Sequence, residues 1–223
     1  MSFVVAIDGP AGTGKGTVTK IISQRMNLLN IDTGAMYRSV TLECIRKNIS
    51  PKDEEKIKEV LENINIELKY IDGEQRIFLN GEDVSKAIRT PEVDNLVAVF
   101  AALKIVRDKL TPIQRKIGEK NDVIMEGRDI GTVVFPNADV KIYLDCSLEE
   151  RARRRYNQNL KKGINESYEE VLDSIKKRHK LETEREIAPF IKADDAITVD
   201  STSMTIEEVA DKIEKIIRGK KND

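Results

Sequence analysis

The sequence predicts an α/β fold in which a parallel sheet is covered by helices on both sides, a three-layer arrangement. Short, continuous apolar runs recur along the chain, and segments with helical periodicity separate most of them. Strands buried on both faces of a parallel sheet have this pattern, because neither face meets water. The expected strands are residues 3–7, 28–31, 123–125, 140–144 and 197–199.

The first expected strand leads directly into a glycine-rich turn. Phe3 to Ile7 is apolar and rich in β-branched residues, and Asp8-Gly9-Pro10 ends it. A helix over about residues 15–26 follows this turn. Further along, apolar residues alternate with polar ones over 64–70, Asp72-Gly73 supplies a turn, and residues 77–79 continue the pattern. This segment predicts a small antiparallel insert.

Three helices are expected in the second half of the chain. The longest covers about residues 92–117, begins after Thr90-Pro91, and breaks or kinks at Pro112. An arginine-rich helix follows Asp145, and a charged helix covers residues 167–185. Helices between the expected strands are what a parallel sheet requires for its crossover connections.

The composition of the chain excludes several classes of protein. Lys plus Arg (38) nearly cancels Asp plus Glu (39), so neither a disordered chain nor a globally basic nucleic-acid binder is indicated. The two cysteines have no metal-binding or redox spacing, and no apolar stretch reaches the roughly 20 residues of a membrane helix. The N-terminal apolar run is too short for a signal peptide. We therefore expect a cytoplasmic protein without membrane or nucleic-acid partners.

The glycine-rich turn between a strand and a helix is typical of a phosphate-binding loop. Its residues are Gly9, Pro10, Ala11, Gly12, Thr13, Gly14, Lys15, Gly16 and Thr17. Backbone N–H groups and the helix N-terminus would surround a nucleotide phosphate, and Lys15 would reach the β- and γ-phosphates. Gly16 stands where the simple G-x-x-x-x-G-K-[ST] pattern has a hydroxyl, so Thr17 becomes the candidate on the Mg²⁺ side. A turn that serves packing alone is the less favoured interpretation.

Polar side chains follow two further strands, at the sheet edge where parallel α/β proteins bind ligands. Residues 32–38, Asp-Thr-Gly-Ala-Met-Tyr-Arg, follow the second strand, and residues 126–132, Glu-Gly-Arg-Asp-Ile-Gly-Thr, follow the third. Both segments carry an arginine beside a glycine and an acid. The sequence therefore predicts a second anion site near the phosphate-binding loop.

Together these motifs closely resemble those of the bacterial-type cytidylate kinases, a branch of the nucleoside monophosphate kinases with a P-loop. The resemblance runs from Phe3 to about Ile217, and it includes Val133 to Pro136 and the late motif Asp200-Ser201-Thr202. It implies transfer of the γ-phosphoryl group of ATP to CMP or dCMP with Mg²⁺, in pyrimidine nucleotide metabolism. It also implies a parallel-sheet core, a small antiparallel insert in the acceptor-binding region and an arginine-rich lid.

The resemblance assigns acceptor-binding roles to residues from several parts of the chain. Those expected to hold the acceptor phosphate are Arg38, Arg128 and Arg185. Those expected to bind the base are Arg107 and Asp129, and those expected to line the sugar are Thr33, Tyr37, Arg178 and Glu182. Cytosine presents an amino donor at N4 and acceptors at N3 and O2, which a carboxylate and a guanidinium match. Uracil would instead direct O4 at the Asp129 carboxylate.

Two sequence details qualify the acceptor-binding assignments. Ala98 stands where the family commonly has a serine that touches the base, and Glu182 stands where an aspartate is usual. Arg178, Glu182 and Arg185 have the spacing i, i+4 and i+7, which predicts one helix face for all three. An ordinary surface salt bridge is the alternative that the spacing alone would favour.

The arginines after Asp145 form the expected lid. Arg151, Arg154 and Arg155 fall on one helical face, and Arg153 lies beside them. Some of them would close over the triphosphate and neutralise charge on the transferred group, so the expected catalytic residues are Lys15, Arg128, Arg151, Arg154 and Arg155. A solvated charged helix paired with Glu149 and Glu150 is the alternative.

The expected domain organisation is a single kinase domain, residues 1–223, and a monomer. Its core would comprise residues 1–60, 90–147 and 186–218, with the acceptor-binding insert at about 61–89 and the lid at about 148–165. Two other functions stay open on the residues alone. One is a kinase for another small acceptor, such as UMP, AMP or shikimate, and the other is a P-loop ATPase or switch.

Overall fold

A computed structural model describes residues 2–71 and 74–222, which form two compact units. The first unit comprises Met1–Ile31 and Ile117–Asp223, and the second comprises Asp32–Lys116. Asp72 and Gly73, the expected turn of the insert, lie outside the described residues. Within the described ranges, no helix is both long and apolar enough to cross a membrane.

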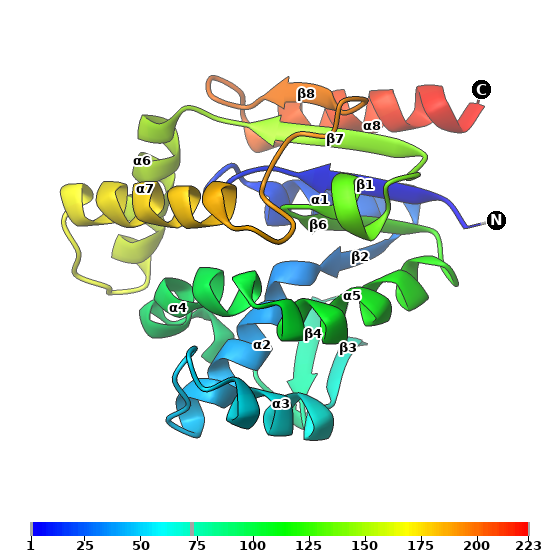
Figure 1. The fold of residues 1–223 in the computed structure, drawn as a ribbon. Helices are drawn as coiled ribbons and strands as arrows, with labels where there is room; N and C mark the ends of the chain where they lie inside the picture. The colour runs from blue at the N-terminus through cyan, green and yellow to red at the C-terminus, as the bar shows by residue number, and fades with distance from the viewer. Residues whose placement is uncertain (1, 72–73, 223) are drawn as a thin grey trace. The chain divides into compact units, whose positions relative to one another are not determined.

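The central element of the first unit is a five-stranded sheet (Figure 1). Its strand order is β2 (Leu29–Asp32), β6 (Val123–Gly127), β1 (Val4–Asp8), β7 (Val140–Asp145) and β8 (Ile197–Asp200). β1 pairs in parallel with both β6 and β7, and β7 pairs in parallel with β8. All five residues of β1 are buried, as its continuous apolar pattern predicted. The expected strands and the α/β class are therefore confirmed.

The register of β1 brings three chain segments to one edge of the sheet. Asp8 is level with Gly127 of β6 and with Tyr143 of β7. The phosphate-binding loop, the Arg128–Asp129 turn and the segment after Asp145 consequently begin side by side. A parallel sheet gathers such loops because its strands all end at the same edge.

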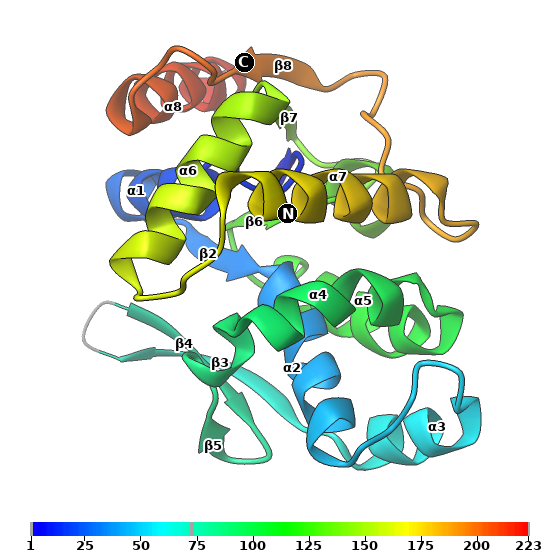
Figure 2. The ribbon, with the colours of Figure 1, turned by 90° about the vertical axis from the view of Figure 1, so that its left-hand side faces the viewer.

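Helices of the first unit pack on this sheet and on each other. They are α1 (Lys15–Met26), α6 (Leu148–Lys161), α7 (Tyr168–Glu184) and α8 (Ile206–Asn222). α1 and α8 share an apolar core with β1, in which Val18 and Ile22 meet Ile213 and Ile217. α6 and α7 pack side by side, as Figure 2 shows in yellow-green and yellow. Ser147 caps α6, and Ser167 forms a capping box with Glu170 at the start of α7.

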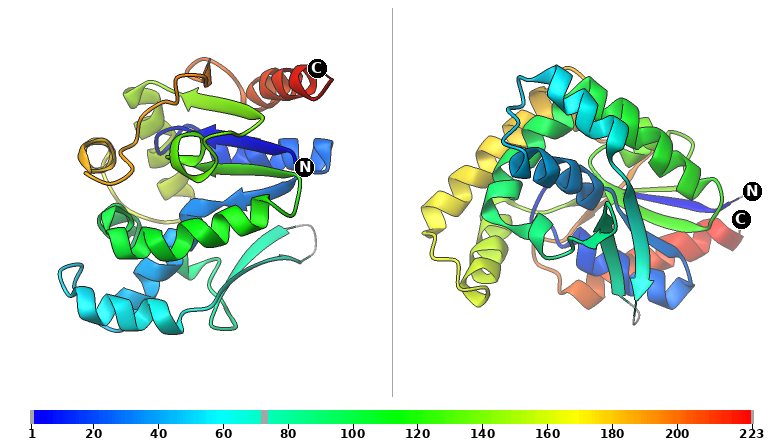
Figure 3. Two further views of the ribbon diagram at one scale, coloured as in Figure 1. Left: turned by 45° about the vertical axis from the view of Figure 1, so that its right-hand side comes forward. Right: turned by 90° about the horizontal axis from the view of Figure 1, so that it is seen from below.

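The second unit combines helices with the small antiparallel sheet that the alternating pattern predicted. Its elements are α2 (Thr33–Arg46), α3 (Glu54–Asn63), β3 (Ile66–Ile71), β4 (Glu74–Leu79), β5 (Glu82–Asp83), the short 3₁₀ helix η1 (Ala87–Arg89), α4 (Pro91–Ala102) and α5 (Lys104–Gly118). β3 and β4 form an antiparallel hairpin, which Figure 3 shows in two views. A separate apolar core, with Met36, Ile57 and Phe100 fully buried, holds the helices to the sheet.

The helix expected at residues 92–117 is two helices, and the expected break at Pro112 is wrong. The chain leaves helical geometry at Leu103, where ψ is 127°. Pro112 lies inside α5. At the break, the Arg107 guanidinium donates to the Ala101 carbonyl at 3.2 Å and so caps the last turn of α4. A side chain from the following helix therefore stabilises a boundary that no proline or glycine marks.

Candidate active site

The phosphate-binding loop joins β1 to α1 with its backbone wrapped around the helix N-terminus. Gly12 and Gly14 have φ angles of 86° and 88°, a conformation that residues with a Cβ rarely adopt. Gly14 is the N-cap of α1, and no side chain caps this helix end. An anion would complement the N–H groups at the start of α1 and the helix dipole.

Lys15 is buried and directed into the loop. Its ammonium donates to the carbonyls of Gly9 and Pro10, each at 2.7 Å, and lies 3.4 Å from the Thr13 hydroxyl. Burial, followed by the charge of Arg128, lowers the pKa of Lys15 to about 7. A phosphate in the loop would favour the charged form of this lysine and compete with the two carbonyls for its protons.

Glu126 at the end of β6 approaches the loop where Gly16 replaces the usual hydroxyl. A Cβ at position 16 would lie 3.1 Å from the Glu126 Oε1, so the carboxylate occupies the space that a side chain would fill. The Thr19 hydroxyl lies 3.5 Å from the same oxygen, and Thr17 is exposed on the first turn of α1. In the part of the chain that the structure describes, no group of three or more His, Cys, Asp or Glu is arranged so that it could hold a metal ion.

This donor set fits Mg²⁺, which prefers oxygen ligands and usually binds one or two carboxylates together with substrate phosphates and water. Glu126 supplies one carboxylate and Thr17 one hydroxyl, at the place where a nucleotide phosphate would enter. A zinc-type site would need more protein ligands than these residues provide.

Arg128 and Arg178, which are partly buried, pair with the buried Glu182 beside the loop. Glu182 is 4% exposed, and its two carboxylate oxygens accept from the Arg128 Nε at 2.8 Å and the Arg178 Nε at 2.9 Å. Burial alone would raise the pKa of Glu182, but the charges of Arg128 and Arg178 outweigh it and lower that pKa to about 2. Because each arginine uses its Nε for this bond, Glu182 fixes the orientation of both guanidinium planes.

Arg185 lies near Asp129, but the expectation that it shares a helix face with Arg178 and Glu182 is wrong. α7 ends at Glu184, and Arg185 is in extended geometry with ψ of 142°. Its Nε donates to the Ala188 carbonyl at 2.6 Å, and its Nη2 lies 3.8 Å from the Asp129 Oδ1. The chain turns after Glu184, and this turn, rather than helical spacing, brings the guanidinium to Asp129.

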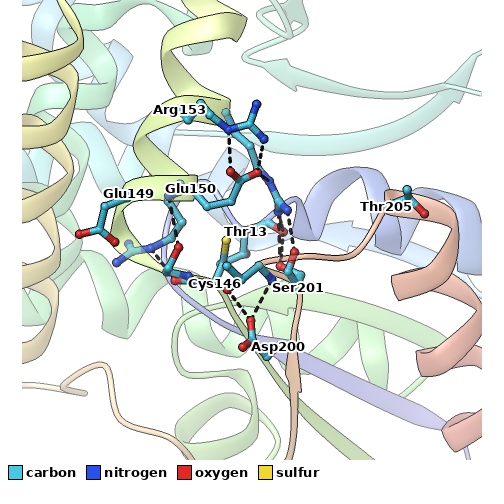
Figure 4. Close-up of polar contacts among 12 residues, drawn as sticks. Thr13, Cys146, Glu149, Glu150, Arg153, Asp200, Ser201 and Thr205 are labelled. Atoms are coloured by element: carbon cyan, nitrogen blue, oxygen red, sulfur yellow. Dashed lines mark hydrogen bonds and ion pairs between the residues drawn. The ribbon is translucent and has the colours of Figure 1, made fainter.

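The arginines of α6 separate into two groups. The Arg154 guanidinium donates to the Thr13 carbonyl at 3.2 Å and to the Ser201 carbonyl at 2.7 Å, and its Nε pairs with Glu150. Figure 4 labels these three partners. Arg151 is buried, and it donates to the carbonyls of Cys146 at 3.1 Å and Ala11 at 3.4 Å. Both therefore contact the phosphate-binding loop directly.

The other two arginines bond within α6. Arg153 is exposed and pairs with Glu150 through two bonds of 2.7 Å. Arg155 donates to Gln158 at 3.1 Å. Ser201 ties the same region together, since its hydroxyl lies 2.9 Å from the Asp145 carbonyl and 3.4 Å from the Thr13 carbonyl. The segment after β8 is thus attached to the loop after β1.

In the second unit, the side chains expected to bind the acceptor cluster at the start of α2. The Arg38 guanidinium pairs with Asp32 at 2.7 Å, and Arg89 approaches the same oxygen at 3.3 Å. The burial of Asp32 acts against its ionisation, but Arg38 and Arg89 outweigh this and lower its pKa. Asp32 also accepts from the Ala35 N–H and so caps α2.

The residues expected to bind the base and the sugar in this unit are buried. The Arg107 guanidinium lies 5.5 Å from the centre of the Tyr37 ring, in cation–π geometry, and Arg107 is 4% exposed. Thr33, the first residue of α2, is also buried, as is Ala98 on α4. Each unit therefore has its own set of polar side chains. In the second unit, arginines pair with the carboxylate of Asp32. In the first unit, arginines surround the phosphate-binding loop that contains Lys15.

Comparison with known proteins decides the family. The sequence model of the family described as cytidylate kinase matches residues 5–219. The chain belongs to the cytidylate kinase family. A cytidylate kinase of Bacillus subtilis is 48% identical over 216 residues, which cover 97% of this chain and 96% of that protein. A cytidylate kinase of Bacillus cereus is 46% identical over 215 residues, with 96% of each chain covered.

A solved structure supports the fold of this cytidylate kinase family member. The crystal structure of an uncharacterized protein from Eubacterium ventriosum superposes with a TM-score of 0.56, over 98% of this chain and 99% of that one. The two sequences are 13% identical, so this likeness concerns the fold alone.

Sequence reasoning gave no role to three charged residues that the structure places at these sites. Asp8 accepts two backbone N–H groups of the turn after β6, Glu126 lies against Gly16, and Arg89 pairs with Asp32. Asp8 could have been noticed, because it is a charged residue in a strand that is otherwise apolar and buried. Glu126 is marked only by its place at a strand end, and nothing near Arg89 indicates its partner.

Proposed function

We propose that this chain transfers the γ-phosphoryl group of ATP to CMP and dCMP, giving CDP and dCDP. The match to the cytidylate kinase family over nearly the whole chain carries this proposal. The buried lysine and arginines around an uncapped helix N-terminus support it, because two phosphorylated substrates need several fixed cations. Kinases for UMP, AMP or shikimate and a P-loop ATPase are not favoured by that family membership.

The loop from Gly9 to Thr17 would bind the ATP phosphates through its backbone N–H groups. When ATP binds, the Lys15 ammonium would exchange its hydrogen bonds to the carbonyls of Gly9 and Pro10 for bonds to the β- and γ-phosphates. Thr17 and Glu126 would hold Mg²⁺, which would supply positive charge to neutralise the phosphates. The residues that surround the loop thus position the donor before any bond is broken.

Charge on the transferred group would be stabilised by Lys15 and by the arginines that converge on the loop. Arg128 and Arg151 are two of these candidates, since the charge of Arg128 lowers the pKa of Lys15 and Arg151 contacts Ala11. Arg154 and Arg155 on α6 complete the proposed set of catalytic residues. Phosphoryl transfer needs alignment and charge stabilisation more than covalent chemistry, so no nucleophilic side chain is required.

For the acceptor, we propose that Arg38, Arg128 and Arg185 hold the CMP phosphate. The attacking phosphate oxygen is already anionic, so it needs little help from a base. Asp129 and Arg107 would bind cytosine, because a carboxylate matches its N4 amino donor and a guanidinium matches its acceptors. Thr33, Tyr37, Arg178 and Glu182 would line the sugar, with Glu182 acting chiefly through the two arginines that it orients.

We place this reaction in pyrimidine nucleotide metabolism, in the cytoplasm, carried out by a monomer. Ala98 lacks the hydroxyl with which the family commonly touches the base. A missing polar contact of this kind weakens discrimination between related acceptors, because specificity depends on pairing buried polar groups. We therefore expect CMP and dCMP to be the best acceptors and UMP to be a poor but measurable one.

A coupled ADP-release assay with CMP, dCMP, UMP, AMP and shikimate as acceptors tests the proposal. CMP and dCMP should give the highest kcat/KM. Arg128→Ala should raise the KM for CMP more than the KM for ATP, whereas equal losses would point to misfolding. A higher kcat/KM for any acceptor other than CMP or dCMP would overturn the assignment.

A further inference from the structure

Asp8 is a buried carboxylate to which the proposed mechanism gives no role. It ends β1, is 6% exposed, and directly precedes the phosphate-binding loop. Its Oδ1 accepts from the Ile130 N–H and its Oδ2 from the Gly131 N–H, each at 2.8 Å. One carboxylate thus satisfies two backbone donors that lie 122 and 123 residues further along the chain.

Those two donors belong to the first turn of a short π-helix, η2 (Ile130–Val134). Asp129 is the N-cap residue of this turn, and aspartate at an N-cap usually accepts from the N–H groups that follow it. Here the Asp129 side chain makes no such bond. Its carboxylate instead lies 3.8 Å from the Arg185 guanidinium. Asp8 therefore performs the capping that Asp129, by its position, would otherwise perform.

We propose that Asp8 is a positioning residue for acceptor recognition: by capping η2 from the end of β1, it keeps the Asp129 carboxylate turned toward Arg185. The inference rests on the proposed function, in which Asp129 and Arg185 bind CMP. It adds a role for a residue to which the proposed function assigns no contact with either substrate. The same residue is bonded to Gly9, so it also fixes the acceptor-binding turn relative to the phosphate-binding loop.

The chemistry of the site requires a carboxylate. Two convergent N–H donors need two acceptor oxygens, and an amide side chain offers one oxygen and one NH₂ group that would face the second donor. Burial raises the pKa of Asp8 to about 6, and the facing charges are Lys15 and Asp129.

The kinetic test compares Asp8→Asn with Asp139→Asn. Asp139 also accepts a backbone N–H of β1, from Val4 at 2.7 Å, but at the opposite end of the strand. Asp8→Asn should raise the KM for CMP about tenfold and lower the preference for CMP over UMP by a similar factor, as loss of one oriented charged contact would. The KM for ATP should change less than about twofold. Asp139→Asn should leave all three values unchanged.

A double variant separates positioning from a structural role. If Asp8 acts through Asp129, adding Asp8→Asn to Asp129→Asn should change the CMP preference less than about twofold, because the group to be positioned is already absent. Full additivity would overturn the proposal. The proposal would also be overturned if Asp8→Asn lowers the melting temperature and either changes the KM for CMP and the KM for ATP equally or changes neither.

A crystal structure of unliganded Asp8→Asn tests the geometry without any substrate. We expect the Asp129 carboxylate to leave Arg185 and to accept from the Ile130 or Gly131 N–H. An Asp129 that stays beside Arg185 would refute the inference. If the wild-type protein does not phosphorylate CMP, the proposed function fails, and this structure still decides whether Asp8 positions Asp129.

Discussion

Replacing Glu182 by glutamine tests the ion-pair network that holds Arg128 and Arg178. The substitution keeps the shape of the side chain and removes its charge. The carboxylate is 4% exposed and accepts from both Nε atoms at 2.8 and 2.9 Å. Glutamine can accept at one oxygen only, so its NH₂ group would face one of the two arginines. Both guanidinium groups would lose the charge that orients them.

The pKa of Glu182 gives the size of the effect. Its lowering from 4.5 to about 2 corresponds to about 3 kcal/mol of preference for the charged form in the folded protein. Because the folded-state pKa is below the unfolded one, this stabilisation is present above pH 4.5 and is lost as the pH falls toward 2. Glu182→Gln should therefore lower the free energy of unfolding by about 2–3 kcal/mol at pH 7.

Urea unfolding at pH 7 and at about pH 3 measures this difference. The gap between wild type and Glu182→Gln should shrink by roughly half at the lower pH, because the wild type loses its own stabilisation there. Glu214→Gln is the matched control, since Glu214 also bridges two arginines, Arg25 and Arg218, but on the surface. The control should cost less than about 1 kcal/mol. Equal costs for the two variants, or a gap independent of pH, would refute the reasoning.

Three further predictions concern the phosphate-binding loop and residues beside it. Lys15→Ala should lower kcat about 100-fold or more with an unchanged circular dichroism spectrum, and near-normal turnover would remove Lys15 from the mechanism. Burial raises the pKa of Asp8 from 3.8 to about 6, so the folded protein holds this proton more tightly than the unfolded chain does. The ionisation of Asp8 should therefore lower the free energy of unfolding by about 3 kcal/mol as the pH rises from 3.8 to about 6. The free energy of unfolding of Asp8→Asn, measured with urea, should lack this dependence on pH. The same dependence in the variant and the wild type would contradict the prediction. Arg154→Ala should raise the KM for ATP about tenfold, while Arg153→Ala on the exposed face should not; equal effects would show that the bonds to Thr13 and Ser201 are unimportant.

The sheet and its order of helices could be predicted because the signals are local. A strand such as Val4–Asp8 is buried on both faces, so its apolar run is visible in five consecutive residues. The hairpin of β3 and β4 is visible in its alternation. The break between α4 and α5 could not be predicted from local sequence, because Leu103 is an ordinary helix former and the cap at Ala101 comes from Arg107. Pro112 misled because a proline can be accommodated inside a helix by neighbouring structure.

The candidate site likewise has parts that the sequence could predict and parts that it could not. The phosphate-binding loop could be found because backbone geometry and Lys15 lie within nine consecutive residues. The pairing of Arg128 with Glu182 joins positions 54 residues apart, and that of Asp8 with Ile130 spans 122. No spacing rule covers such contacts, since they depend on which strand ends meet at one edge of the sheet. The family resemblance supplied roles for Arg128 and Glu182, but it did not indicate that Glu182 bonds two arginines at once.

Transfer of label from [γ-³²P]ATP tests the central claim most directly. The protein is incubated with CMP and Mg²⁺, and the products are separated by chromatography. We expect the label to appear in CDP and to depend on CMP. Label found only in inorganic phosphate, at a rate that CMP does not change, would contradict the assignment of this chain as a CMP kinase.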